Sequence, residues 1–398
     1  MSSRRCSATK LGSAGFTLVE LLVALVVSAL AAAGIYEGFI STSNAFTQTK
    51  AEGNAWQQAR TAITVITQAV ESAGYGLPMV NCTQIYSNNF QAQGGGLLSL
   101  APVSAQTPTP TTLNPYDPGL SPINAGVSTY ELQTVTGGGS YGSAPVTYIS
   151  KVSSVNAAQV QVASSQSLLT SDIFLVALPN GSCMLGQITN TTLQSPSVVF
   201  NSGARGSSFN LAGGFSAIDP TVTPAQIQRA GFIDLGQAGF AVDNFFVGYR
   251  YNTASGSYDY NSVPSLYMQQ YTSANGQGAA PPSELVARGV VDMQVEFGYG
   301  TRGSVTSWGP PNLSQPGRNV DAVKVALVVR DTRVLPNAGT RAGNIIPIFK
   351  NAVPAVTYTI PQALPANKTT GCLDGDCSHY LYRVMKTVIP VRNVIWDQ

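Results

Sequence analysis

A single carboxylate stands inside an otherwise apolar stretch near the start of the chain. Glu20 ends the segment GFTLVE, which begins at Gly15, and the apolar run continues to Ile35. A carboxylate in a helix that seeks hydrocarbon is unfavourable by about 2.5–3.5 kcal/mol on insertion scales. The chemistry that such an acid offers is charge pairing, so it needs a cationic partner. The partner we expect is an amine created by cutting the chain between Gly15 and Phe16.

The leader in front of this stretch is basic and holds no acid, so it is expected to stay on the cytoplasmic side of a membrane. Three interpretations compete: an ordinary secretory signal cut near Ala31, a plain signal anchor, and a leader cut before Phe16 that keeps the apolar segment. Glu20 favours the third, because cleavage near Ala31 would discard the acid. The basic residues of the leader are Arg4, Arg5 and Lys10.

The residues GFTLVELLVALVVSAL, which start at Gly15, resemble the prepilin signature of type IV pilins and type II secretion pseudopilins. The resemblance implies cleavage after Gly15 by the membrane prepilin peptidase, followed by N-methylation of the new terminus at Phe16. It also implies that Glu20 pairs with the terminal amine of a neighbouring subunit in a filament. The physics agrees, because two charges in a low dielectric are tolerated when they are paired.

One long helix must position these residues. No proline precedes Pro78, so a helix is expected from about Phe16 to Ala73. Residues 16–40 are apolar and long enough to cross a bilayer as a membrane and filament-core helix. Residues 41–73 form an amphipathic second half, whose apolar stripe should lie on a globular head. That stripe is Phe46, Gly53, Trp56, Ile63, Ile66 and Val70.

The predicted division is a leader at 1–15, the two helix halves, and a β-rich head at 74–398 with an insertion at 85–231. The fold class is α+β, with an antiparallel sheet packed on the helix. Pro390 suits an edge strand or a strand end. Two strands are predicted to show one apolar face each, Phe245, Val247, Tyr249 and Tyr251, and Val291, Met293, Val295 and Phe297. Further strand-like runs are Val146–Val152, Ile173–Leu178, Val323–Val329 and Tyr380–Val391.

The composition describes a folded, exported chain. Of 398 residues, 44% are hydrophobic and 10% charged, which argues against disorder. Three of the 21 basic side chains lie in the leader, which leaves 18 beside 19 acidic ones. A nearly neutral chain without a basic run has no electrostatic footprint for nucleic acid.

Four cysteines follow the apolar segment, Cys82, Cys183, Cys372 and Cys377. An even number in an exported domain predicts two disulfides, for which three connectivities are possible. Cys372 with Cys377 would close a small loop, and Cys82 with Cys183 would follow. Four free buried thiols are the alternative.

Two short segments match catalytic motifs, and we interpret both matches as chance. Gly138–Gly142 fits G-x-S-x-G but lacks the flanking strand and helix, and His379 is the only histidine. Gly298–Gly303 fits G-x-G-x-x-G, yet Gly and Pro follow where a dinucleotide site needs a helix, so a strand-end turn is expected.

Neither a cofactor nor a metal is expected. One histidine and oxidised cysteines disfavour zinc. Asp374 and Asp376 could lend oxygens to Ca²⁺, but two acids fall short of its six to eight ligands. A solvated disulfide loop is the default for that segment.

Three segments resemble the PilW family of minor pilins: ESAGYG from Glu71, SDIFLVALPNGSCMLGQIT from Ser171 and YRVMKTVIPVRNV from Tyr382. This resemblance implies a non-enzymatic minor pilin that is processed by the prepilin peptidase and a methyltransferase. Expected partners are other minor pilins, the major pilin, the inner-membrane assembly platform and, before assembly, membrane lipid. The protein would cross the inner membrane once, with its head in the periplasm, and then join a pilus fibre at the surface.

Two rivals from other classes remain at this stage. One is a pseudopilin J of type II secretion, which a neighbouring gene for a secretion ATPase would indicate. The other is a secreted β-rich binding protein or hydrolase, which would start near Ala31 and lose Glu20.

Overall fold

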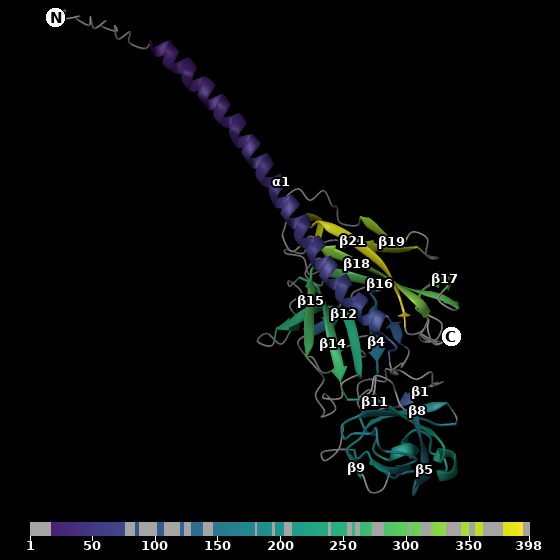
Figure 1. Ribbon diagram of the computed structural model, residues 1–398. Coiled ribbons are helices and arrows are strands. Elements are labelled where there is room, and N and C mark those ends of the chain that lie inside the picture. Colours follow the sequence, from purple (N-terminus) through teal and green to yellow (C-terminus); the bar gives the residue numbers. More distant parts are fainter. Residues whose placement is uncertain are drawn as a thin grey trace, which may run out of the picture. The chain divides into compact units, whose positions relative to one another are not determined.

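Figure 1 shows the chain as a computed structural model. It forms two compact units, Met1–Ala51 and Glu52–Gln398. The structure describes residues 17–75, 84–86, 102–106, 120–122, 129–137, 146–179, 181–192, 196–202, 209–237, 240–252, 257–258, 263–272, 282–301, 304–311, 320–331, 344–349, 355–360 and 377–392.

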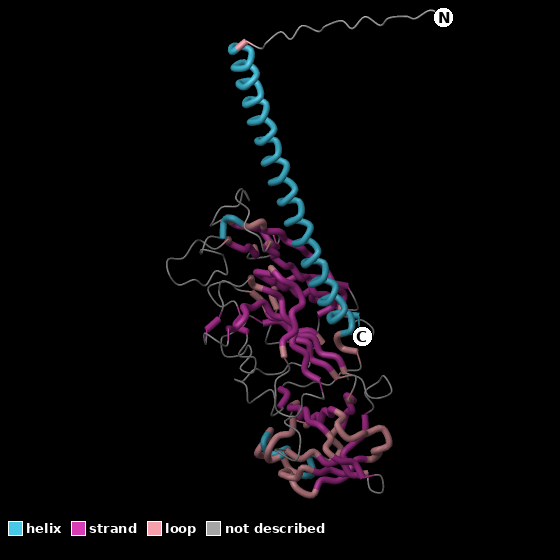
Figure 2. Tube along the Cα trace, turned by 90° about the vertical axis from the view of Figure 1, so that its left-hand side faces the viewer, coloured by secondary structure: helices cyan, strands magenta, loops and turns pink. Residues whose placement is uncertain are grey.

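One long helix, α1 (Leu18–Ser72), begins in the first unit and ends in the second. Figure 2 shows it as one continuous helix. The helix expected from Phe16 to Ala73 is thereby confirmed over its described residues. It ends at Gly74, whose φ of 80° is a left-handed conformation that glycine adopts without strain.

The described part of the second unit is built from antiparallel sheets, apart from one parallel pair, β1 with β8. The α+β class predicted from the sequence is confirmed. Sheet one has the strand order β1 (Gln84–Tyr86), β8 (Ser182–Gln187), β7 (Ile173–Ala177), β11 (Gly231–Gly236), β5 (Val146–Val152), β6 (Gln159–Val162), β10 (Ser197–Val199) and β9 (Asn190–Thr192). Two short helices, η1 (Gly214–Ala217) and α3 (Pro224–Ile227), precede β11.

The remaining strands form three more sheets (Figure 1). Sheet two has the order β15 (Ser283–Arg288), β14 (Ser265–Thr272), β12 (Ala241–Asn252), β4 (Glu131–Thr136) and β2 (Val103–Gln106), and β13 (Ser257–Tyr258) and β3 (Leu120–Pro122) also pair with β12. Sheet three is β17 (Ser304–Gly309), β16 (Val290–Thr301), β18 (Val320–Arg330) and β21 (Tyr382–Pro390). A hairpin, β19 (Ile345–Phe349) with β20 (Val356–Thr359), completes the set.

The predicted insertion at 85–231 coincides only in part with one structural element. Most of that stretch builds sheet one, but β2, β3 and β4 from the same stretch join sheet two. The insertion stays a prediction, and the described strands of 85–231 are divided between the two sheets. Alternation of apolar and polar residues identifies a strand, but it does not say which partner strand the backbone will choose.

The second half of α1 packs on sheets two and three through small side chains. Its buried residues are Ala55, Ala59, Ala62, Ile66, Ala69, Val70 and Ala73, and they share one core with Phe245, Val295, Phe297 and Val325. The predicted stripe is right for Ile66 and Val70 and for Ile63, which is partly buried against this core. It is wrong for Gly53, which is exposed, and for Phe46 and Trp56, which are 69% and 40% exposed. Close packing favours the alanine face, because a methyl group lets the helix backbone approach the strands.

The two central strands of sheet three, β16 and β18, are buried on both faces. Met293, Val295 and Phe297 face the helix core as expected, but Val291 lies in a different cluster with Ala326, Val328 and Tyr358. The pairing of β16 with β18 shifts register between Val290 and Asp292, which breaks the alternation of side chains between the two faces of β16. Val290 therefore lies in the helix core in place of Val291. The polar partners Asp292, Gln294 and Glu296 are also buried, although alternation normally places such residues in water.

Two other strand predictions are confirmed. Phe245, Val247 and Tyr249 lie together in the helix core, and the side chain of Tyr251, the fourth residue of that predicted face, is outside the described ones. Pro390 ends β21, which is the last strand of sheet three, so it removes no hydrogen bond from the interior of the sheet.

Replacing Ala62 by leucine should destabilise the head by about 1–3 kcal/mol, because Ala62 is 0% exposed and extra methylenes must push the helix from the sheet. Denaturant unfolding of the full chain measures this. Thr61→Leu, at an exposed neighbouring position, is the matched control and should change stability by less than about 0.5 kcal/mol. Equal effects of the two variants would contradict the close alanine packing.

Candidate functional site

The first turn of α1 is closed by Thr17 and Glu20. The Glu20 carboxylate accepts from the backbone N–H and from the hydroxyl of Thr17, each at 3.1 Å. In return the backbone N–H of Glu20 donates to the Thr17 hydroxyl oxygen at 3.3 Å. This reciprocal arrangement is a capping box, and it satisfies two N–H groups that a helix start leaves without partners.

The capping box gives Glu20 a local role that sequence reasoning missed. Its signal, Thr-x-x-Glu before an apolar run, is present in the sequence. The carboxylate therefore has a use even before any neighbour arrives. Among the described residues Glu20 forms no ion pair, and it accepts both hydrogen bonds from Thr17 through a single oxygen, Oε2. A carboxylate has about four acceptor positions, so room remains for a cation.

The rest of the first half of α1 presents hydrocarbon. Apolar side chains from Leu18 to Ile40 are exposed all round the helix, and α1 is long and apolar enough to cross a membrane by length and composition. The Ser28 hydroxyl in this stretch donates to the carbonyl of Ala24, and just beyond the stretch Thr42 donates to the carbonyl of Gly38 at 2.8 Å. Such bonds to the preceding turn hide polar groups that lipid cannot solvate.

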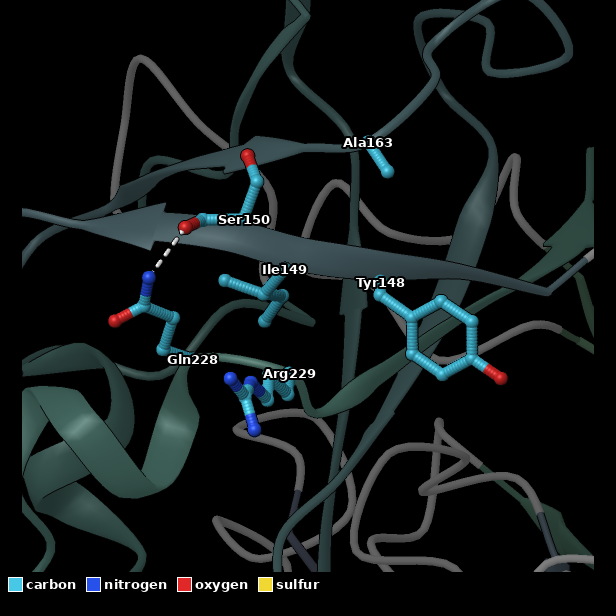
Figure 3. A pocket seen from close by; sticks show the side chains of 6 residues that line it. All are labelled: Tyr148, Ile149, Ser150, Ala163, Gln228 and Arg229. Atoms are coloured by element: carbon cyan, nitrogen blue, oxygen red, sulfur yellow. Dashed lines mark hydrogen bonds between the residues drawn. The ribbon is translucent and has the colours of Figure 1, made fainter.

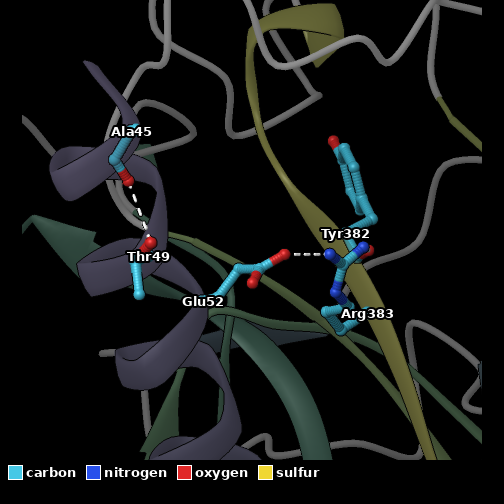
Figure 4. A network of polar contacts seen from close by, with 5 residues as sticks. All are labelled: Ala45, Thr49, Glu52, Tyr382 and Arg383. Atoms are coloured by element: carbon cyan, nitrogen blue, oxygen red, sulfur yellow. Dashed lines mark hydrogen bonds and ion pairs between the residues drawn. The ribbon is translucent and has the colours of Figure 1, made fainter. Parts of the chain in front are cut away.

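Polar contacts fix the second half of α1 on the head. Glu52 forms an ion pair with Arg383 of β21, as Figure 4 shows. Glu71, near the end of the helix, pairs with Arg392 at 3.0 Å. Partly exposed pairs of this kind contribute about 0–1 kcal/mol each, so apolar packing holds the helix and the ion pairs set its register.

The backbone of sheet two also forms a hydrogen bond with α1. The Arg288 N–H at the end of β15 donates to the Gln58 side-chain oxygen at 2.9 Å. Sequence reasoning did not find Arg288, Arg383 or Arg392 as helix partners. No local pattern marks them, because each lies more than 200 residues from its partner in α1.

The predicted cleavage site lies outside the described residues. Gly15 and Phe16 belong to the segment that the structure does not describe, so cleavage and methylation there stay predictions. The same holds for charge pairing of Glu20 with a neighbour.

The cysteines are partly described. Cys183, on β8, and Cys377 are each disulfide-bonded. Cys82 and Cys372 lie outside the described residues, and the predicted pairing of the four stays a prediction. Asp374 and Asp376 also lie outside, so the structure does not test a Ca²⁺ site there.

The catalytic motifs gain no support from the described geometry. Gly298, Gly300 and Thr301 lie on β16, which pairs with β17, so a strand stands where a dinucleotide site needs a helix. Arg302 and Gly303 lie outside the described residues, so the turn itself stays a prediction. Gly138–Gly142 is outside the described residues. Within the described part of the chain, no three His, Cys, Asp or Glu side chains are grouped to hold a metal.

Several buried acids have raised pKa values. Burial raises the pKa of Glu131, Asp234 and Asp292 to about 7. The charge of Asp172 raises the pKa of Asp234 further, while the Gly236 N–H bond lowers it. The three acids that reach about 7 lie on β4, β11 and β16, in three different sheets, so they do not converge on one catalytic pair.

Comparison with known proteins matches two parts of this architecture. Residues 10–36 match the prokaryotic N-terminal methylation motif, which spans the expected cleavage site and Glu20. Residues 245–393 match the family of the type IV pilus-assembly protein W. The two matches together support a type IV pilus pilin of the PilW family. Both resemblances found in the sequence are thereby confirmed, and the match to a pilus protein favours a minor pilin.

The PilW match covers most of the strands on which the second half of α1 packs. Residues 245–393 include β14 to β21 and most of β12, together with Arg288, Arg383 and Arg392. The segment from Ser171 that resembles PilW in the sequence lies outside both matches, as does all of sheet one.

The other comparisons add little. No curated protein matches the chain. One similar solved structure is a type IV-like pilin from Thermus thermophilus, at 14% identity and a TM-score of 0.20, over 39% of this chain and 79% of that one. At this TM-score the likeness carries no argument.

The stability of the head should depend on pH through Asp234. Its folded pKa is raised, so the folded state binds more protons than the unfolded state, and stability falls as pH rises from about 4 to about 7. The slope is up to about 1.4 kcal/mol per pH unit for each such group. Asp234→Asn should flatten this fall and stabilise the head at pH 7.5.

Thermal unfolding of the full chain from pH 4.5 to 7.5 measures the effect. Glu284→Gln changes an exposed acid and serves as the control, with a profile like that of the unchanged chain. A pH profile unaltered by Asp234→Asn would show that this carboxyl is ionised in the folded head.

Proposed function

We propose that this minor pilin is inserted in the inner membrane by α1, is cut after Gly15, and then enters a type IV pilus whose assembly it helps to start. The observation that supports this most directly is Glu20 within an exposed hydrocarbon helix, inside the matched methylation motif. A soluble or ordinary secreted protein has no use for that combination.

The chemistry follows from the first turn. Cleavage before Phe16 creates an ammonium group one residue before the capping threonine. The Glu20 carboxylate keeps its Thr17 bonds and has acceptor capacity left. In the bilayer the new amine of the same chain lies four residues away and can offset the charge. In the filament the amine of a neighbouring subunit takes its place, which makes assembly the step that exchanges one pairing for another.

The head supplies the rest of the proposed role. The second half of α1 is fixed on sheets two and three, so movement of the helix into a filament carries the head with it. The basic leader supports a cytoplasmic start and a periplasmic head. The head then contacts other minor pilins, and the protein itself catalyses nothing. The PilW match supports this role over that of a type II secretion pseudopilin.

Glu20→Gln should lower the amount of this protein in sheared filaments at least tenfold, because an amide cannot neutralise an amine. Membrane insertion and leader removal should persist, as immunoblots of membranes and of sheared pili can show. Thr17→Val is the matched control, since it removes the capping hydroxyl and keeps the carboxylate.

Unchanged incorporation of Glu20→Gln would refute charge pairing. Loss of incorporation in Thr17→Val, with Glu20 intact, would assign the acid to helix capping instead.

A further inference from the structure

Sheet one carries a pocket that the pilin role does not use. It is lined by Tyr148, Ile149 and Ser150 of β5, by Ala163, and by Gln228 and Arg229 between α3 and β11 (Figure 3). Its volume of about 470 Å³ falls within the range of small-molecule sites. Sheet one lies outside both family matches, so neither match accounts for the pocket.

An uncovered aromatic ring forms one wall. Tyr148 is 58% exposed although β5 is an inner strand of its sheet. Its neighbours are small: Gly231 lies opposite it on β11, and on the other side the Ala163 N–H donates to the Tyr148 carbonyl at 2.8 Å. A Cβ at Gly231 would meet only the Val146 side chain, at 3.8 Å. The ring therefore has open space beside it.

A cation on a strained backbone also lines the pocket. Arg229 has φ 79°, a left-handed conformation that side chains with a Cβ disfavour and glycine accepts. Its backbone N–H donates to the Ile149 carbonyl at 2.8 Å, and the Gln228 amide donates to the Ser150 carbonyl at 2.9 Å. These bonds to β5 hold the strained turn in place. Strain that a glycine would relieve, at a residue that lines a pocket, indicates a function for its side chain.

The guanidinium is exposed and forms no ion pair with the described residues. Figure 3 shows it and the Tyr148 ring extending from different segments beside β5. A guanidinium binds a carboxylate through two parallel hydrogen bonds, and an aromatic face packs against the apolar face of a ring. The Gln228 amide oxygen and the Ser150 hydroxyl remain for the hydroxyls of a ligand.

We propose that this pocket binds an acidic sugar residue, with its carboxylate on Arg229 and its ring against Tyr148. A single cation lines the pocket, which suits a monoanion better than a phosphate group. The inference does not depend on how the protein enters a filament.

The test uses the full-length mature chain in a zwitterionic detergent without sugar headgroups. Titration calorimetry with methyl β-D-glucuronide should give saturable binding. Methyl β-D-glucoside, which lacks the carboxylate, and inorganic phosphate, which lacks the ring, should each bind at least tenfold more weakly. Arg229→Gln and Tyr148→Thr should each weaken glucuronide binding at least tenfold.

Matched controls separate binding from folding. Arg60→Gln and Tyr75→Thr change an exposed cation and an exposed ring elsewhere and should bind as the unchanged chain does. Arg229→Gly should raise the unfolding temperature, by relieving the strained backbone, while it abolishes binding. Absence of glucuronide binding at millimolar concentration, equal binding by Arg229→Gly, or a preference for phosphate would overturn the proposal.

Discussion

Glu20 carries a negative charge on a helix whose surface is otherwise hydrocarbon, and that charge has to be neutralised in every state that excludes water. The capping box with Thr17 satisfies hydrogen bonds but supplies no positive charge. A new amino terminus at Phe16 would supply it. In the proposed function this requirement links three separate features: a basic leader that would be removed, a helix start that would be kept, and a neighbour whose amine would complete the pair.

The two halves of helix α1 suit two different environments. Its first half exposes branched and long apolar side chains, and the Ser28 hydroxyl within it donates to a carbonyl of the same helix, as a lipid environment requires. Its second half buries alanines against sheets two and three, where close approach matters more than side-chain size. Ion pairs to Arg383 and Arg392 fix the register of that contact. The PilW match covers most of the strands in these two sheets. Sheet one, which has its own pocket, lies outside the match.

The sequence predicted those features that depend on local pattern. The length of α1, the importance of Glu20, the α+β class and the edge position of Pro390 follow from spacing, charge and composition. Features that depend on partners far along the chain were missed or wrong. The predicted contact face of α1 included Trp56 and omitted the alanines, because large apolar side chains were expected to make the contacts. Val291 was placed on the wrong face, because a bulge interrupts the period of two without any sign in the sequence.

Intact-mass analysis with N-terminal sequencing of the protein taken from membranes and from pili tests the central claim most directly. The account predicts a chain that starts at N-methylated Phe16 and retains Glu20. A start beyond Glu20, or an uncut leader in pili, would contradict it.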